Sequence, residues 1–200
     1  MHIDIIIPDR NEHELIEMAK RLDWDALCLV YEKRADADHI KGLKSPLPLI
    51  FASHIEKNAS LRLMRGTGED RTSLERGGFD LYYGMEETAR HDRLHHREGG
   101  LNHVLCKLMH KHGIVYGINF DSVLNAEATK RAILIGRMRQ NFKLCADADV
   151  PIVVASFATT PYQMRTPHDL RATMLSFGMN TAQAKESILH LGIRLANHLK

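Results

Sequence analysis

Short apolar runs alternate along this chain with stretches in which apolar residues recur every three or four positions. Runs of the first kind are typical of buried strands, and the spacing of the second kind predicts helices. Strands are expected at 3–7, 26–31, 47–53, 61–66, 79–84, 113–120 and 150–156. Helices are expected at 11–22, 101–112, 126–146, 167–177 and 182–198, with a short polar turn-and-helix segment between 66 and 79. Asn11 is expected to cap the first helix.

The order of these elements favours one fold class. Alternating strands and helices form a parallel sheet covered by helices, and strands that are apolar throughout are buried on both faces. We therefore expect residues 1–200 to form a single domain with a TIM-barrel-like parallel barrel. Typical TIM barrels have about 250 residues, so some of the helices should be missing or reduced here. An open, doubly wound sheet is the alternative.

Composition limits the partners and the cellular compartment that are expected for the protein. The formal net charge is only +2, so any contact with nucleic acid must come from local clusters of basic residues. Cys28, Cys106 and Cys145 form no C-x-x-C pair, which indicates free thiols in a reducing compartment. The apolar run near the N-terminus is too short for a signal peptide or a membrane span, so a cytoplasmic protein without membrane contact is expected.

The segment "HHREGGLNHVLCKLMHKH" (95–112) holds five of the thirteen histidines. On a helix from Leu101, a core face would be formed by Leu101, Val104, Leu105, Leu108 and Met109. The opposite face would carry His103, Cys106 and His110, a set that resembles a zinc site. His103 and His110 would lie about 10.5 Å apart along the helix, which is far for ligands of one ion. A hydrated helix face is therefore the favoured interpretation.

A second possible metal pair is His2 and Asp4. These residues share one face of the first strand, but they lie at its start, whereas barrel active sites lie at the carboxyl ends of strands. A buried structural Asp4, bonded to backbone or to an arginine, is the better prediction. The sequence contains no G-x-S-x-G, P-loop or G-x-G-x-x-G motif.

Basic residues gather in two parts of the chain. Arginines are dense between Arg62 and Lys111, and they include Arg90, Arg93 and Arg97. On the long helix, Lys130, Arg137 and Asn141 project within about 40° of one another. Arginines can fork onto phosphates, so these residues could form an RNA- or partner-binding surface, with solubilising charge as the alternative.

A possible anion site precedes the helix at 167–177. Thr166 can cap this helix and Pro167 fits its first position, with Arg165 directly before the cap. Free N–H groups at a helix start attract anions, and TIM barrels often bind phosphate after their late strands. A capped helix with an exposed arginine is the alternative interpretation.

Longer motifs resemble those of a known family, ribonuclease P protein component three, the archaeal counterpart of the eukaryotic thirty-kilodalton subunit. The similar segments are "IDIIIPD", "DRTSLE" ahead of "FDLYYG", "HREGGLNHVLCKLMHKHGIVYGINF" and "IVVASFATTPYQMRTPHDLRATMLSFGMN". Together they run through nearly the whole chain. By motif match, family signature positions are occupied by Arg71, Arg97, Asn102, His103 and Arg165. Asn102, at a helix start, could instead bond backbone groups.

The resemblance implies a barrel related to the PHP metallohydrolases but without their metal centre. It implies a subunit of the enzyme that removes the 5′ leader from precursor tRNA, in which the RNA component is the catalyst and requires magnesium. The implied partners are that RNA, precursor tRNA, a small ferredoxin-like subunit in a heterotetramer, and other RNase P proteins. The isolated chain is then not catalytic and needs no cofactor of its own.

Two features depart from the family pattern. The chain has "SFA" after its last strand where the family usually has "SGA", and histidines 91, 95, 96, 110 and 112 are not family signatures. We interpret these histidines as solvated and partly protonated. The alternative functions are a metal-dependent PHP-type phosphoesterase and, less favoured because no catalytic base is evident, a sugar-phosphate enzyme that uses Arg165.

Overall fold

Seven parallel strands form the centre of the computed structural model, which describes residues 1–32, 42–89, 91–92 and 97–196. The strands are β1 (Ile3–Ile6), β2 (Ala26–Val30), β3 (Leu49–Ser53), β4 (Leu61–Arg65), β5 (Leu81–Tyr83), β6 (Val115–Asn119) and β7 (Ile152–Ala155). They pair in sequence order, each parallel to the next. All seven were predicted from the apolar runs.

The sheet curls until its two ends meet. Beyond β7 the chain pairs with β1 through a parallel bridge between Ile6 and Ala158. Phe157 N donates to Ile5 O at 2.8 Å, and Ile7 N donates to Ala158 O at 2.9 Å. The strands therefore form a nearly closed, TIM-barrel-like barrel, and the open doubly wound alternative is wrong.

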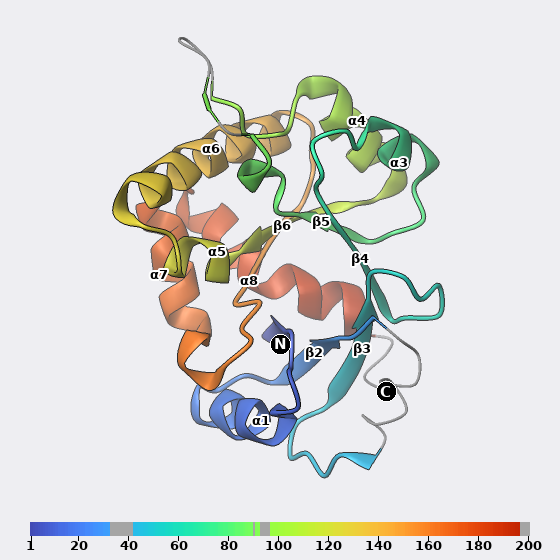
Figure 1. The fold of residues 1–200 in the computed structure, drawn as a ribbon, viewed down its shortest axis with the longest axis vertical. Helices are drawn as coiled ribbons and strands as arrows, with labels where there is room; N and C mark the ends of the chain where they lie inside the picture. The colour runs from blue at the N-terminus through green and yellow to red at the C-terminus, as the bar shows by residue number, and fades with distance from the viewer. Residues whose placement is uncertain (33–41, 90, 93–96, 197–200) are drawn as a thin grey trace.

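Helices cover the barrel unevenly (Figure 1). They are α1 (Glu12–Arg21), α3 (Arg71–Arg76), α4 (His103–His112), α5 (Phe120–Leu124), α6 (Ala128–Asp147), α7 (Pro167–Ser176) and α8 (Thr181–Leu195), with short 3-10 turns η1 (Met85–Glu87) and η2 (Pro161–Gln163). The connection between β3 and β4, residues 54–60, contains no helix. Among the connections that the structure describes, the expected reduction of the helical layer thus falls beside β4.

Side chains alternate between two apolar layers. Ile3 and Ile5 point into the barrel, where they pack with Leu63, Leu81 and other inward residues. Ile6 belongs to a separate layer between the strands and the helices. This burial on both faces explains why the strands are continuous apolar runs. In the described part of the chain, no helix combines the length and the apolar character needed to cross a membrane.

The start of α1 differs in detail from expectation. Asn11 stands at the cap position, but its side chain makes no capping bond to the helix. It accepts from Asp9 N at 2.9 Å and donates to Thr159 O at 2.8 Å. Asn11 therefore links two loops at the carboxyl ends of β1 and β7.

Candidate functional site

Most of the residues that the sequence singled out lie around one rim of the barrel. Arg71 begins α3, His103 begins α4, Lys130 lies in the first turn of α6, and Arg165 closely precedes α7. These helices follow β4, β5, β6 and β7, and the segments that follow parallel strands gather at the carboxyl end of the barrel. The residues therefore occupy four consecutive sectors of that rim. They do not converge on one point, because α3 and α4 lie far from α7 (Figure 1).

Asn102 shapes the start of α4. Its side-chain oxygen accepts hydrogen bonds from Val104 N at 2.9 Å and Leu105 N at 3.0 Å. The capping role considered for Asn102 is thus confirmed. His103, the next residue, is exposed at the first position of the helix.

The predicted orientation of α4 is wrong by a fraction of a turn. Cys106 is fully buried, whereas Val104 is 51% exposed. Cys106 packs toward Cys145 of α6, so it cannot share an exposed zinc set with His103 and His110. Among the described residues, no three or more His, Cys, Asp or Glu side chains are grouped so that they could hold a metal ion.

The extra histidines do not share one environment. His91 and His110 are exposed, as expected, while His95 and His96 lie outside the described residues, as do Arg90 and Arg93. His112 is different, because its Nε2 is buried with no hydrogen-bond partner in the described part of the chain, and its ring packs against Gly77. Our interpretation of His112 as a solvated side chain is wrong.

The side chain of Arg97 packs against α6 at Gly136. Its Nη1 lies 3.2 Å from Asp92 Oδ2, and its side chain remains half exposed. A Cβ added at Gly136 would lie only 2.6 Å from Arg97 Cζ, so the guanidinium rests where a side chain of α6 would otherwise be. The glycine therefore makes room for Arg97.

Arg137 contradicts the predicted surface stripe on α6. Its side chain is 3% exposed, and Asn141 is completely buried, whereas Lys130 is exposed. The reason is the segment that follows β5, which covers this part of the helix. Arg137 donates from Nε to Asp92 at 2.8 Å, and from Nη1 to the carbonyls of Glu86 at 2.8 Å and Ala89 at 2.9 Å. It is an internal brace that ties η1, Ala89 and Asp92 to α6.

A second buried contact holds the glycine pair of the "HREGGLNH" motif. Asn141 Nδ2 donates to Gly99 O at 2.8 Å and to the Tyr116 hydroxyl at 3.2 Å. Tyr116 in turn donates to Glu86 Oε2 at 3.2 Å. Burial raises the pKa of Glu86 to about 7, with the charge of Glu87 adding to the rise. The motif is therefore anchored from inside the protein while Arg97 and His103 remain outside.

Gly136→Ala should move Arg97 without harming the fold. Alanine favours a helix by up to about 1 kcal/mol over glycine, and the atoms that it would meet belong to the flexible end of Arg97. We expect unchanged or slightly higher thermal stability, together with a severalfold loss in the binding of a polyanion such as RNA. The measurement is a melting curve beside a binding titration. If Arg97→Ala already weakens binding, Gly136→Ala should add little in that background.

Aromatic side chains fill the mouth of the barrel. Phe157 stacks on Tyr83 with ring centroids 4.6 Å apart, and the Tyr83 hydroxyl lies 2.8 Å from His54 Nε2. Phe157 is the central residue of the "SFA" segment, for which the resemblance implied "SGA", and its φ of 51° is in the left-handed region that favours glycine. Its nearly complete burial against Tyr83 offsets that strain. The departure from the family pattern thus places a ring at the centre of the mouth.

Asp4 lies buried near this closure. It accepts from Ser156 N at 2.7 Å, from Ser156 Oγ at 2.5 Å and from Ile5 N at 3.0 Å. The structural role predicted for Asp4 is confirmed. Burial raises its pKa to about 7, although these hydrogen bonds act in the opposite direction.

Asp4 should make stability depend on pH in an unusual direction. Its pKa is raised in the folded state from an ordinary 3.8 to about 7, so the folded protein holds the proton more tightly than the unfolded chain. The resulting stabilisation is complete below pH 4 and is lost as the pH rises through 7. The free energy of unfolding of the wild type minus that of Asp4→Asn should decrease by on the order of 1 kcal/mol per pH unit between pH 5 and 7. A difference that stays constant with pH would contradict the raised pKa.

Arg165 is held by its own neighbourhood. Its Nη1 donates to Tyr162 O at 2.8 Å and Met164 O at 2.7 Å, while its carbonyl accepts from the Trp24 indole at 3.0 Å. Thr166 Oγ1 accepts from Asp169 N at 3.0 Å, so the predicted cap is confirmed. Within the described residues, Nε and Nη2 of Arg165 have no partner. The guanidinium of Arg165 is thus held in place through Nη1, and its Nε and Nη2 remain available to donate hydrogen bonds to another molecule.

Together, the fold and the rim define a class of protein: a TIM-barrel-like protein with basic side chains that follow four consecutive strands. The family model for RNase P subunit p30 matches residues 90–195, which include the "HREGGLNH" motif, Arg137 and Arg165. The chain belongs to this family.

Relatives of similar length support the assignment. Ribonuclease P protein component 3 of Methanocaldococcus jannaschii is 37% identical over 189 residues, which cover 86% of this chain and 80% of the relative. The protein of the same name from Methanosarcina acetivorans is 30% identical over 196 residues, covering 90% and 80%. A chain in a cryo-EM structure of archaeal ribonuclease P with mature tRNA has a TM-score of 0.79 at 22% identity, covering 96% of this chain and 90% of that one. This last likeness shows the shared fold.

Proposed function

We propose that this chain supports the catalytic RNA of ribonuclease P through the carboxyl rim of its barrel. Family membership makes the chain a protein subunit of that holoenzyme, which matures tRNA. The observation that supports the role of the rim is the placement of Arg71, His103, Lys130 and Arg165 after four consecutive strands. An extended basic rim suits a long polyanion better than a small substrate, because each cation can meet a different phosphate.

The proposal divides the predicted site residues into two groups. Arg97, His103, Lys130 and Arg165 are accessible, so they contact RNA phosphates or acidic groups of a partner. Arg71 is accessible as well, but its Nε already binds Glu75 at 2.8 Å, so Arg71 should contribute less to the affinity for RNA than the other four. Asn102 and Arg137 act from within the fold and position the others.

The proposed assembly includes a small ferredoxin-like protein, with which the chain forms a heterotetramer, and other RNase P proteins. The RNA component performs the cleavage and binds the magnesium, and the complex works in the cytoplasm. The protein's cations share with magnesium the screening of RNA phosphates.

Reconstitution tests this role. RNase P RNA and precursor tRNA are combined with the small partner protein, with and without this chain, and cleavage is followed over a magnesium titration. The chain should lower the magnesium concentration needed, and the chain without RNA should not cleave. An unchanged magnesium requirement would contradict the supporting role. Cleavage by the RNA-free chain that a chelator abolishes would favour the phosphoesterase alternative.

A further inference from the structure

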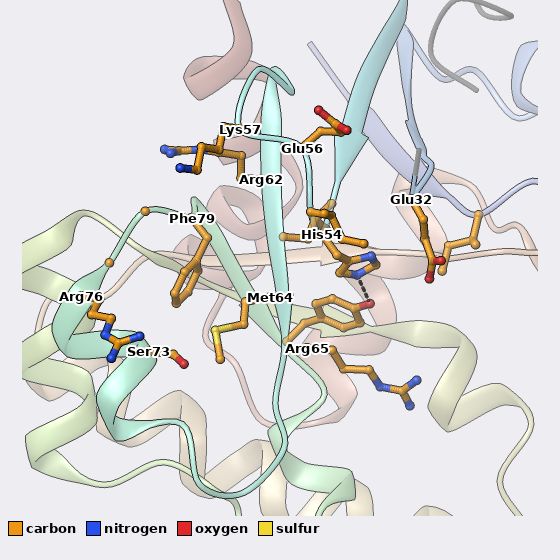
Figure 2. Close-up of a pocket in the computed structure, with 16 residues that line it drawn as sticks. Glu32, His54, Glu56, Lys57, Arg62, Met64, Arg65, Ser73, Arg76 and Phe79 are labelled. Atoms are coloured by element: carbon orange, nitrogen blue, oxygen red, sulfur yellow. Dashed lines mark hydrogen bonds between the residues drawn. The ribbon is translucent and has the colours of Figure 1, made fainter. Parts of the chain in front are cut away.

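A cavity of about 690 Å³ opens beside β4. Its lining includes none of Arg71, His103, Lys130 and Arg165, and it shares His54 and Tyr83 with the mouth of the barrel. It exists because residues 54–60 connect β3 to β4 without a helix, so the outward side chains of β4 are only half buried. Met64 of β4 and Phe79, just before β5, contribute apolar surface to it, as Figure 2 shows. The cavity thus has an apolar floor with an accessible aromatic ring.

Cations border this floor on two sides. Lys57 lies in the β3–β4 connection and Arg76 at the end of α3, and neither has a hydrogen-bond or ion-pair partner among the described residues. Arg62 binds Asp80 through Nε at 3.0 Å and Nη2 at 3.1 Å, and Arg194 binds the same carboxylate at 2.9 Å. That group of three keeps one net positive charge. Glu32 and Glu56 are the carboxylates on the border, and Arg65, a further cation of the lining, is paired with Glu87 at 3.3 Å.

Gly77 and Gly78 form one wall of the cavity, which is packed against α4 on one side and accessible on the other. Both glycines have left-handed backbone conformations, with φ of 66° and 94°. A Cβ at Gly77 would lie 2.8 Å from the His112 ring, so this turn packs directly on α4, whereas a Cβ at Gly78 would meet nothing within 4 Å. The turn is therefore held in place from behind and leaves its outer side accessible.

We propose that this cavity binds an unpaired nucleotide of RNA, with its base against Phe79 and adjoining phosphates at Lys57 and Arg76. Single-stranded nucleic acid sites combine an aromatic platform with a positively charged groove, and the cavity offers both. A stable protein interface buries about 800 Å² on each partner, far more than the whole lining of this cavity exposes, so a single nucleotide suits the cavity better. The inference rests on the proposed function, since it names a further RNA contact of the same subunit.

Titrations of a fluorescent, unstructured ten-nucleotide RNA with the full chain at several salt concentrations test the site. Phe79→Leu keeps the apolar packing but removes the ring, so it should weaken binding about tenfold without changing the salt dependence. Lys57→Gln and Arg76→Gln should each lower the slope of log affinity against log salt by about 0.7. Glu56→Gln should strengthen binding severalfold. Lys20→Gln on α1, away from the cavity, is the control and should change nothing.

Unaltered affinity in Phe79→Leu, or unaltered slopes in Lys57→Gln and Arg76→Gln, would overturn the inference. Polyglutamate that competes with the RNA equally well in the wild type and in Phe79→Leu would indicate an acidic protein partner instead. Melting curves identify any variant that unfolds, and Phe79→Tyr, which keeps an aromatic ring, should bind as the wild type does. Holoenzyme assembly that depends on Arg165 but not on Phe79 would leave the proposed function standing and remove only this site.

Discussion

Replacing Arg137 with alanine is expected to lower the free energy of unfolding by about 3 kcal/mol, the scale for breaking a buried ion pair. The substitution removes three hydrogen bonds at once and leaves the Glu86 carbonyl without its partner in the interior. It also removes the cation that lowers the pKa of Asp92 against the opposing effect of burial. For a chain of this size, the loss corresponds to a decrease in melting temperature on the order of 10 °C.

Thermal denaturation of matched variants checks this expectation. Arg139→Ala, two positions further along α6, removes an exposed arginine and should change stability by less than about 0.5 kcal/mol. Arg137→Lys retains the charge but not the planar fork, so it should recover only part of the loss. An Arg137→Ala variant as stable as Arg139→Ala would show that the brace is unimportant to the fold.

Arg165→Ala is expected to weaken holoenzyme assembly by about tenfold to a hundredfold. A charge-assisted hydrogen bond contributes roughly 1.5–3 kcal/mol, and the guanidinium has nitrogens available to make one. Stability should change little, because the bonds lost on the protein side go to two carbonyls of a surface segment. Arg165→Lys should rescue only partly, since an ammonium cannot make a forked contact.

The Arg165 experiment requires an assembly titration beside a melting curve for each variant. Arg21→Ala at the end of α1 is a matched control, since it removes an exposed arginine from another helix. Full assembly by Arg165→Ala would exclude the contact. A large decrease in melting temperature would instead make Arg165 an internal support of the η2 turn.

The sequence predicted the barrel well because its strands are buried on both sides. Each strand is a continuous apolar run, and the parallel order follows from the helices between the runs. The gap beside β4 was expected only in general terms, as a reduction of the helical layer. Its location depends on the β3–β4 connection, whose tertiary environment is not encoded in a local pattern.

The site was predicted less completely, and α6 shows why. Lys130 and Arg137 do point in similar directions, but they lie about 10.5 Å apart along the helix, and only the later one is covered by the segment after β5. A signal was present, because the apolar stripe Leu134, Met138, Phe142 and Cys145 encloses both Arg137 and Asn141. A polar residue inside an apolar stripe indicates a buried, bonded group.

Other contributors carry no local signal at all. Gly136 is ordinary in sequence, and its importance for Arg97 comes from two residues about forty positions apart meeting in space. Asp92 lies only five positions from Arg97, but its bond to Arg137, 45 positions away, depends on the fold. Similarly, Phe157 departs from a family glycine, but its stacking on Tyr83 requires the closed barrel.

The seam between β1 and the segment after β7 has a consequence for how the chain folds. Asp4 and Ser156 are separated by 152 positions, so the hydrogen bonds that close the barrel join the two ends of the sheet. During synthesis, β1 can pair with β2 early, but its other edge waits until residues 156–158 have been made. Contacts between such distant positions are slow to form, and an unpaired edge of an apolar strand is prone to aggregation. A nascent chain stopped before Ser156 therefore exposes that edge of β1. The edge becomes protected only when residues 156–158, at the start of the last fifth of the protein, have emerged and paired with it.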